Sequence, residues 1–381
     1  MKSVILYAHP VQPDGLSIQG HYLYKGMLEN GEQVEPCHLS SEFEKKWLYT
    51  YFKPDVAIGI GYWNYTPDII HDPLQYGVQP VPWLVADGWV ANYQKDLSAL
   101  PLVLTTSTWV KETYARDGVD TKNFEVMPIG FDPKVHRPVP RTDTRVQAIR
   151  KMLGIEDDEI MIFTMGGDVT SKGAQEILKA LKKVDQEFKK WKYVCKVWGG
   201  DSADDHYEAE MKLIEDLGDS QNKVQYLEGS FSHEFTPYLL SACDIYAAPS
   251  RLEGFGMIQM EAQACGVPVI SIDYMGPRET VVHGETGFLA KVGETVDLTE
   301  EWAYQGMGFK EDHKIKFEKP KTFGYRADID ELAQYLLRLM KDPDLRATMG
   351  KKATANAVQK FEYHIIAKRT AELIKQRLKL K

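Results

Sequence analysis

Two acidic residues of the chain, Glu253 and Glu261, flank the short loop Gly254–Met257, which follows an apolar stretch. A helix is expected to begin at Gly256 or Met257. The first turn of a helix has unpaired N–H groups and the positive end of the helix dipole, and glycine lets a phosphate approach the backbone closely. The spacing therefore predicts an anion site at this helix start. Its expected backbone donors belong to Gly254, Phe255, Gly256 and Met257.

The two glutamates are expected to contact different parts of one ligand. Glu261 lies about four residues into the expected helix, about 6 Å from its start, where its carboxylate can reach the two hydroxyls of a ribose. Glu253 lies in the loop and faces whatever follows the second phosphate, which in a nucleotide sugar is the sugar. The alternative is that both are surface carboxylates that stabilise the helix dipole. The Glu-Gly-Phe-Gly run directly after a buried strand favours the functional interpretation.

A second glycine loop, Met165–Gly173, also lies between an expected strand and an expected helix, and it contains Gly166, Gly167 and Lys172. Lysine is a mobile point charge suited to a diphosphate leaving group, on which negative charge develops as the glycosidic bond breaks. The order Lys-Gly differs from a Walker A loop, where lysine follows glycine. The alternative is a solvated lysine at a helix start, which is unfavourable beside the positive dipole end unless an anion is bound.

The first part of the chain offers weaker candidates. Asp87 ends the strand-like run Val81–Trp89, where a carboxylate could stabilise positive charge on a sugar or orient an acceptor hydroxyl. Asp14 and Gly15 follow the first expected strand, where a donor phosphate or an acceptor could approach the backbone. Both Asp-Gly pairs are equally typical of ordinary turns.

Apolar strand-like runs alternate with turns and helical stretches in two series, which predicts an α/β protein with parallel sheets. The first series ends before the proline-rich segment Pro133–Thr144, and the second restarts at Ile160. We predict a domain over residues 1–140, a second over 141–360 and a closing helix over 361–381 that packs on the first domain. Within the second, residues 293–325 resemble an insertion whose purpose is not readable from the sequence.

Length and composition limit the class of protein. The chain has 381 residues, 43% of them hydrophobic, and a formal net charge of −9, which argues against nucleic acid as the main partner. Its four cysteines are far apart and have no zinc spacing, so we expect a reduced cytoplasmic protein without a structural metal. No apolar run is long enough for a signal peptide or a membrane span. A lysine-rich helix, Lys179–Lys192, could contact an anionic membrane surface, although such runs are usually solvated faces.

These motifs resemble the family 4 retaining glycosyltransferases of the GT-B fold, in which two doubly wound, Rossmann-like domains face a central cleft. The likeness rests on the Glu-x7-Glu motif Glu253–Glu261, on its Pro-Ser-Arg-Leu-Glu-Gly-Phe-Gly flank, and on Gly284–Leu289. It extends weakly over most of the chain. The resemblance implies that Glu253 contacts the transferred sugar, that Glu261 holds the ribose, and that Lys172 contacts the phosphates.

The same resemblance implies a reaction in which a sugar passes from a nucleoside diphosphate to an acceptor with retention of configuration. A donor phosphate oxygen takes the acceptor proton, and neither cofactor nor metal is required. UDP is the commoner donor nucleotide of the family and GDP the alternative. The acceptor is a glycan, a lipid or a small molecule, and the sugar, the acceptor and the oligomeric state stay open.

The chain departs from the family at two positions. An arginine usually lies near Gly166–Gly167, and a histidine often stands where this chain has Asp87. Arg251 and Arg278 are the candidate replacements for the missing arginine. The departures keep two alternatives open, namely a catalytically silent nucleotide-sugar-binding protein and a GT-B hydrolase or epimerase that acts on the nucleotide sugar without an acceptor.

Overall fold

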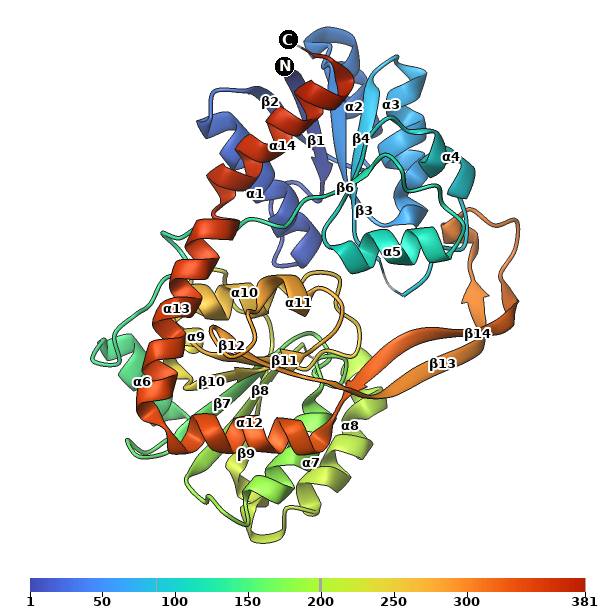
Figure 1. The fold of residues 1–381 in the computed structure, drawn as a ribbon. Coiled ribbons are helices and arrows are strands. Elements are labelled where there is room, and N and C mark those ends of the chain that lie inside the picture. Colours follow the sequence, from blue (N-terminus) through green and yellow to red (C-terminus); the bar gives the residue numbers. More distant parts are fainter. Residues whose placement is uncertain (87, 199–200, 381) are drawn as a thin grey trace. The chain divides into compact units, whose positions relative to one another are not determined.

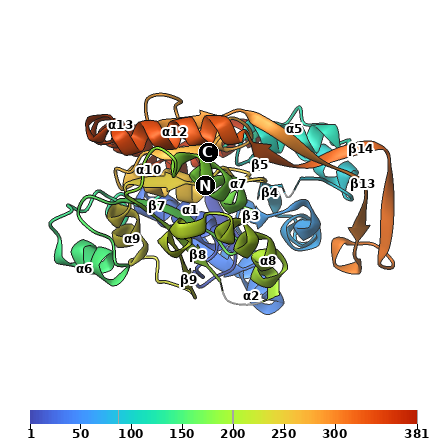
Figure 2. The same cartoon turned by 90° about the horizontal axis from the view of Figure 1, so that it is seen from below.

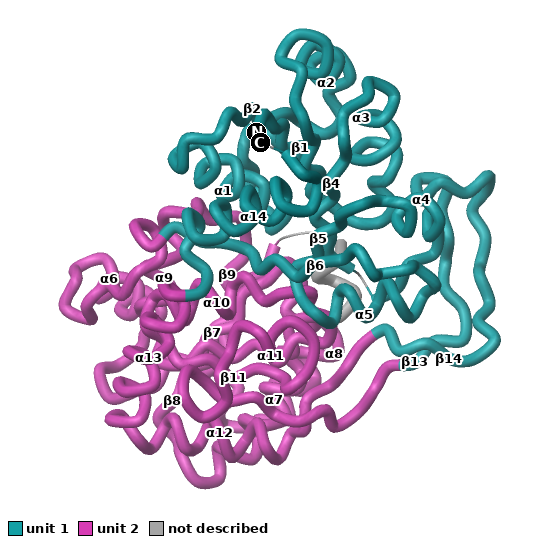
Figure 3. The backbone as a smooth tube through the Cα atoms, turned by 45° about the horizontal axis from the view of Figure 1, so that its top comes forward, with its two compact units in different colours: residues 1–132, 297–323, 360–381 teal, residues 133–296, 324–359 magenta. Residues whose placement is uncertain are grey.

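The computed structural model describes residues 1–86, 88–198 and 201–380, and the side chains of 201–206 are not described. The chain divides into two compact units, coloured separately in Figure 3. Unit 1 comprises Met1–Asp132, Asp297–Phe323 and Lys360–Lys381, and unit 2 comprises Pro133–Val296 and Gly324–Gln359. The sequence placed the whole of 141–360 in one domain, whereas the structure groups 297–323 with unit 1.

Unit 1 is built on a parallel sheet, six-stranded in its described part, with the strand order β2-β1-β3-β4-β5-β6 (Figure 1). The strands are β1 (Lys2–Tyr7), β2 (Gln33–His38), β3 (Val56–Gly61), β4 (Gln79–Leu84), β5 (Val103–Thr105) and β6 (Phe124–Val126). The helices are α1 (Gly15–Glu29), α2 (Glu42–Trp47), α3 (Asp72–Gln75), α4 (Gln94–Ala99), α5 (Thr108–Arg116) and α14 (Tyr363–Leu378). Short helical turns occur at Leu48–Phe52, Trp63–Tyr65, Pro67–His71 and Gln305–Met307.

Glycines allow close packing of the unit 1 elements. A Cβ atom at Gly61 of β3 would lie 2.2 Å from the ring of Tyr65. A Cβ atom at Gly26 of α1 would lie 2.6 Å from the Cβ of Ala367 on α14, so these two helices approach each other closely. The C-terminal helix therefore belongs to the packed body of unit 1.

A long hairpin, drawn as a twisted ribbon in Figure 2, is formed by β13 (Val292–Ala303) and β14 (His313–Ala327). Its outer part packs within unit 1. The ring of Trp89 lies 5.6 Å from that of Phe317 and 5.8 Å from that of Phe323, measured between centroids. The ammonium of Lys321 lies 2.8 Å from the buried carboxylate of Asp117. The segment that the sequence left uninterpreted is thus an ordered hairpin.

Unit 2 is built on a second parallel sheet, also six-stranded in its described part, with the order β12-β11-β10-β7-β8-β9. The strands are β7 (Ile160–Met165), β8 (Trp191–Val197), β9 (Val224–Glu228), β10 (Ile245–Ala247), β11 (Val269–Ile272) and β12 (Gly287–Ala290). The helices are α6 (Thr144–Met152), α7 (Ala174–Val184), α8 (Asp201–Glu215), α9 (Thr236–Ala242), α10 (Met257–Ala264), α11 (Pro277–Thr280), α12 (Ile329–Lys341) and α13 (Pro343–Phe361), with a turn at Gly218–Lys223.

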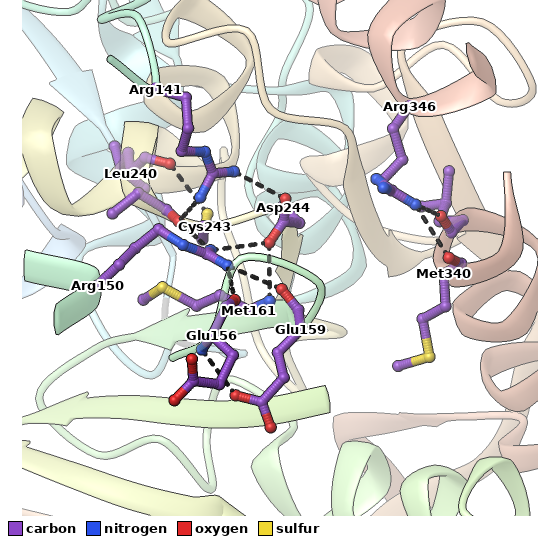
Figure 4. A network of polar contacts seen from close by, with 12 residues as sticks. Arg141, Arg150, Glu156, Glu159, Met161, Leu240, Cys243, Asp244, Met340 and Arg346 are labelled. Carbon is purple, nitrogen blue, oxygen red and sulfur yellow. Dashed lines mark hydrogen bonds and ion pairs between the residues drawn. The ribbon is translucent and has the colours of Figure 1, made fainter. Parts of the chain in front are cut away.

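A polar network around Asp244 fixes the start of unit 2 to its sheet (Figure 4). The carboxylate of Asp244, just before β10, accepts hydrogen bonds from Arg141 at 2.7 Å and from Arg150 of α6 at 3.1 Å. It also accepts one from the backbone N–H of Met161 on β7 at 2.8 Å. One carboxylate therefore ties the proline-rich segment, helix α6 and two central strands together.

Two Rossmann-like α/β domains with parallel sheets were predicted from the sequence, and the structure confirms them. In the two parallel sheets, strands β2 and β12 were not predicted. Strand β2 contains Pro36, which cannot donate to a ladder and is tolerated because β2 lies at the sheet edge. Strand β12 has only four residues and is also an edge strand. No helix in the described part of the chain is both long and apolar enough to cross a membrane.

Candidate functional site

Helices α7 and α10 follow neighbouring strands of the unit 2 sheet. Each is preceded by a glycine in the left-handed region, Gly173 with φ 87° before α7 and Gly256 with φ 95° before α10. A Cβ atom at Gly173 would lie 2.4 Å from the carbonyl oxygen of Pro249, so the two loops are in contact. Strands β7 and β10 are parallel neighbours at which the strand order reverses, the place where open α/β sheets bind ligands.

The two charged residues of these loops, Lys172 and Glu253, form an ion pair. Their Nζ and Oε2 atoms are 2.7 Å apart. The other carboxylate oxygen, Oε1 of Glu253, accepts a hydrogen bond from the backbone N–H of Gly256 at 3.1 Å. The carboxylate of Glu253 is therefore itself the anion at the start of α10, where the sequence predicted a phosphate.

Glu261 lies in the second turn of α10 and is only 4% exposed. Burial raises the pKa of its carboxyl group to about 8. Its Oε2 lies 3.6 Å from Nε2 of His136, and burial lowers the pKa of that imidazole well below 6.5. Burial thus disfavours the charged form of both groups, and the contact is not an ion pair near neutral pH.

Tyr246 of β10 lies close enough to both glutamates to feel their charges. It is fully buried, and burial, together with the negative charges of Glu253 and Glu261, raises its pKa well above 10. Its hydroxyl donates a hydrogen bond of 3.4 Å to the carbonyl oxygen of Met165 at the end of β7. Lys172, Glu253, Tyr246 and Glu261 therefore form one constellation, called the α10 site below.

The two loop glycines are closely approached by neighbouring side chains. A Cβ atom at Gly166 would lie 2.7 Å from Cγ of Lys172, so the lysine side chain passes over this glycine. A Cβ atom at Gly167 would lie 2.6 Å from the ring of Trp198. The indole occupies the space that a side chain at position 167 would need.

The two arginines considered as replacements are held by other carboxylates. The guanidinium of Arg251 lies 2.9 Å from Glu176 of α7, a residue that also pairs with Arg326. The guanidinium of Arg278 lies 2.8 Å from the carboxylate of Asp273. In this structure both arginines are engaged in pairs outside the α10 site.

A third cation, Lys196, was not selected from the sequence. It lies at the end of β8, directly beside Met165 of β7 in the sheet, and is only 6% exposed. Its ammonium lies 5.6 Å from the ring centroid of Trp198 and 5.9 Å from that of Phe231, and burial lowers its pKa. A lysine at the carboxyl end of a central strand is the signal that could have indicated it.

The remaining predicted site residues lie in different parts of the fold. Phe255 is buried, and the backbone of Gly254 and Phe255 packs against Gly276. Gly15 is the first residue of α1 in unit 1, and the carboxylate of Asp14 accepts a hydrogen bond from the backbone N–H of Ser17 at 2.9 Å, as an N-cap. Asp87 lies outside the described residues.

Two histidines near Glu261 were also missed. His136 lies in the proline-rich segment and His233 precedes α9, and their ring centroids are 4.7 Å apart. Their sequence separation of almost one hundred residues gives no sign of this proximity, which only the fold creates.

Residues 145–303 match the family model described as glycosyl transferases group 1. The GDP-mannose-dependent monoacylated alpha-(1-6)-phosphatidylinositol monomannoside mannosyltransferase of Corynebacterium glutamicum is 27% identical over 258 residues, which cover 66% of this chain and 56% of that protein. The D-inositol 3-phosphate glycosyltransferase of Mycobacterium bovis is 30% identical over 204 residues, covering 52% of this chain and 40% of that protein. The chain thus spans about half the length of the curated relatives it matches.

The structure of Anabaena HepE in complex with UDP and glucose has a TM-score of 0.73 at 18% identity, covering 99% of this chain and all of that chain. A sucrose-phosphate synthase from Thermosynechococcus elongatus has a TM-score of 0.74 at 18% identity and covers both chains completely. These likenesses concern the fold. The chain therefore has the GT-B fold, and its residues 145–303 are similar to the glycosyl transferases group 1.

Proposed function

We propose that this protein is a retaining, family 4 glycosyltransferase that moves a sugar, a hexose being expected, from a nucleoside-diphosphate sugar to an acceptor. The observation that carries the proposal is the Lys172–Glu253 pair at the start of α10, 2.7 Å apart and 81 residues distant in sequence. It lies where the strand order of the unit 2 sheet reverses, beside two glycine-preceded helix starts. A cation, the amides at a helix start and a carboxylate are the groups that a diphosphate-linked sugar needs.

In this proposal, the diphosphate of the donor replaces the Glu253 carboxylate as the anion at the start of α10. The diphosphate displaces the Glu253 carboxylate. It then contacts the ammonium of Lys172 and the backbone N–H groups of Gly254, Phe255, Gly256 and Met257. Glu253 then turns to the hydroxyls of the sugar. Lys172 stabilises the charge that develops on the leaving diphosphate, which is the interaction that accelerates the reaction. Gly166 lets the stem of Lys172 pass over the loop backbone, which positions its ammonium for the phosphates.

Glu261 is assigned to the ribose. Its carboxylate is buried within the second turn of α10, where two hydroxyl donors would satisfy it and favour the ionised form. Lys196 is our candidate for the second cation, because it is the buried lysine at the neighbouring strand end and has only ring contacts around its ammonium among the described residues. It replaces Arg251 and Arg278 in that assignment, since both pair with carboxylates elsewhere.

For retention, an oxygen of the donor phosphate would accept the acceptor proton as the new glycosidic bond forms on the face from which the diphosphate leaves. This route needs no carboxylate base, cofactor or metal ion. Asp87 and Gly15 of the first domain stay candidates for contacts with the acceptor or the donor. Localisation in the cytoplasm, with peripheral membrane contact as the alternative, also stays a proposal.

The nucleotide is the first point to test. One relative is named for GDP-mannose and one structural neighbour was solved with UDP and glucose, so both nucleotides belong in the experiment. A thermal-shift screen with UDP, GDP and their hexose conjugates should identify the donor, because a ligand at 100 times its dissociation constant adds about 2.7 kcal/mol of stability.

The reaction is tested with the donor so identified. Incubation with and without candidate acceptors, followed by NMR of the anomeric proton, should give a product with the donor's configuration. Equal release of nucleoside diphosphate without acceptor would indicate a hydrolase, and a new sugar-nucleotide would indicate an epimerase. Donor binding without any turnover would identify a silent binding protein.

A further inference from the structure

A buried histidine of unit 2 has no role in the proposed transfer. His136 is 1% exposed, and neither of its ring nitrogens has a hydrogen-bond partner within the described structure. A buried polar group without a partner loses its hydration without compensation, so such groups are rare in native proteins unless a ligand or a solvent molecule satisfies them. The ring must therefore be explained by what faces it.

Two further metal-ligating side chains face this ring. Nε2 of His136 lies 3.6 Å from Oε2 of Glu261, and its ring centroid lies 4.7 Å from that of His233. One ligating atom from each of the three residues lies within 4.8 Å of the other two. They come from three separate places in unit 2, the proline-rich segment, the residues before α9 and helix α10.

The spacing of these atoms suits a transition-metal ion. Zinc bonds of about 2.0–2.1 Å in tetrahedral geometry place neighbouring ligand atoms about 3.4 Å apart. The observed 3.6 Å between the imidazole nitrogen and the carboxylate oxygen is close to that distance. Two imidazoles and one carboxylate are a common ligand set for zinc, with a fourth position left for water or another ligand.

We propose that His136, His233 and Glu261 bind one divalent transition-metal ion of the zinc class. Metal binding requires neutral imidazole, and burial already holds His136 in that form. The ion would satisfy a nitrogen of His136 and neutralise the buried carboxylate of Glu261. In this proposal the ion takes no part in the transfer step.

The proposed metal site shares Glu261 with the proposed ribose site. This part of the inference rests on the proposed function. A metal ion that holds the carboxylate of Glu261 prevents it from accepting the ribose hydroxyls, so the metal-bound protein should bind the nucleotide more weakly. The two ligands are then mutually antagonistic, by the same factor in each direction.

Isothermal titration of Zn²⁺ into the chelator-treated full chain tests the metal site. We expect one Zn²⁺ per chain for the wild type and at least a tenfold weaker affinity for His136→Phe, which keeps a ring in the buried position. His313→Ala, a change of an exposed histidine on β14, serves as the matched control and should bind like the wild type. Absence of stoichiometric binding to the wild type, or unchanged binding to His136→Phe, would overturn the proposal.

His233→Ala provides a second test if His136→Phe does not fold, because His233 is only partly buried. It should also weaken Zn²⁺ binding at least tenfold. Replacement of Zn²⁺ by Co²⁺ adds a spectroscopic readout, since tetrahedral Co²⁺ with nitrogen and oxygen ligands absorbs visible light. A Co²⁺ spectrum identical in the wild type and the His233→Ala protein would contradict the assignment.

The antagonism is tested by titrating UDP and GDP with and without saturating Zn²⁺. The His136→Phe protein at the same Zn²⁺ concentration corrects for metal held by the nucleotide itself. Nucleotide affinity should fall at least tenfold in the wild type and stay unchanged in the variant. Equal affinity in both conditions would overturn the antagonism alone, whereas no nucleotide binding to the metal-free protein would contradict the proposed function and leave the metal site standing.

Discussion

The two sheets of this protein each have one point where the strand order reverses, and the residues at these points differ in kind. In unit 1 the reversal lies between β1 and β3, and the loop after β1 supplies an aspartate that caps its own helix. In unit 2 it lies between β7 and β10, and the loops supply Lys172 and Glu253, paired across two helix starts. Both sheets have such a reversal point, but among the described loop residues only those of unit 2 include a lysine paired with a glutamate at helix starts.

Glycines have two different roles in this chain, and the residues named here illustrate both. In unit 1, Gly26 and Gly61 allow a helix or a ring to pack closely. In unit 2, Gly173 and Gly256 have positive φ angles at the starts of the two helices of the α10 site. The comparison teaches that glycine spacing alone does not identify a phosphate site, because a close-packing glycine and a loop glycine have the same signature in sequence.

The largest effect should come from Glu253. Replacement by alanine removes the carboxylate assigned to the sugar, and loss of one preorganised electrostatic contact typically lowers kcat by about 10²–10³. Steady-state kinetics with the identified donor measure it. Glu285→Ala, a change of an exposed glutamate on the same unit, is the control and should keep full activity. Equal activities of the two variants would remove the functional distinction between the two sheets.

Lys172→Ala should have the next largest effect. A charge-assisted hydrogen bond is worth about 1.5–3 kcal/mol, so the affinity for nucleoside diphosphate should fall roughly 10- to 150-fold. Calorimetry with UDP or GDP measures this. Lys182 lies on α7, the helix that follows Lys172, and its side chain is exposed. The control variant Lys182→Ala should therefore leave the affinity for nucleoside diphosphate unchanged. If Lys182→Ala weakened binding as much, the loss would reflect the lower net positive charge of the region and not a specific contact of Lys172.

Gly173→Ala should lower stability more than Gly154→Ala. Both glycines have positive φ, which costs an alanine about 1–2 kcal/mol. Only at Gly173 does the added Cβ also meet a backbone atom, the carbonyl oxygen of Pro249 at 2.4 Å, whereas nothing lies within 4 Å at Gly154. Thermal unfolding should show the larger decrease for Gly173→Ala. Equal decreases would mean that the contact between the two loops relaxes freely.

The smallest effect concerns unit 1, where polar contacts attach α14 to α1. Burial opposes the charged form of His364, but hydrogen bonds to Glu362 and Glu29 outweigh it and raise its pKa above 6.5. The stabilisation is therefore complete below pH 6.5 and is lost as pH rises through the raised pKa. Melting temperature from pH 6 to pH 9 should decrease slightly more for the wild type than for His364→Gln. Parallel profiles would contradict this.

Sequence patterns predicted the periodic and local features well. The helix start at Met257 follows from glycine next to an apolar run. The second series of strands begins at Ile160, as predicted, because a buried parallel strand is a continuous apolar run. Strand β2 was missed because it is a half-exposed edge strand with an internal proline. Local sequence patterns were thus sufficient to predict the strands at the centre of each sheet.

Contacts between distant segments could not be predicted in the same way. The pairing of Arg251 with Glu176 depends on how α7 packs beside the loop after β10, and the approach of His136 to Glu261 depends on the course of the proline-rich segment. The packing of Phe317 on Trp89 likewise required the path of the hairpin. Each of these contacts depends on the fold and cannot be predicted from the residues near it in the sequence.

The contacts of the hairpin also determine which truncated forms of the protein would expose buried surface. Phe317, Phe323 and Lys321 cover Trp89 and Asp117 of unit 1, and α14 covers α1. A truncated polypeptide that ends near residue 132 would leave an indole, a buried carboxylate and one helix face bare to solvent. Unit 1 is therefore assembled from three pieces of chain, and it becomes complete only after helix α14 (Tyr363–Leu378) has left the ribosome.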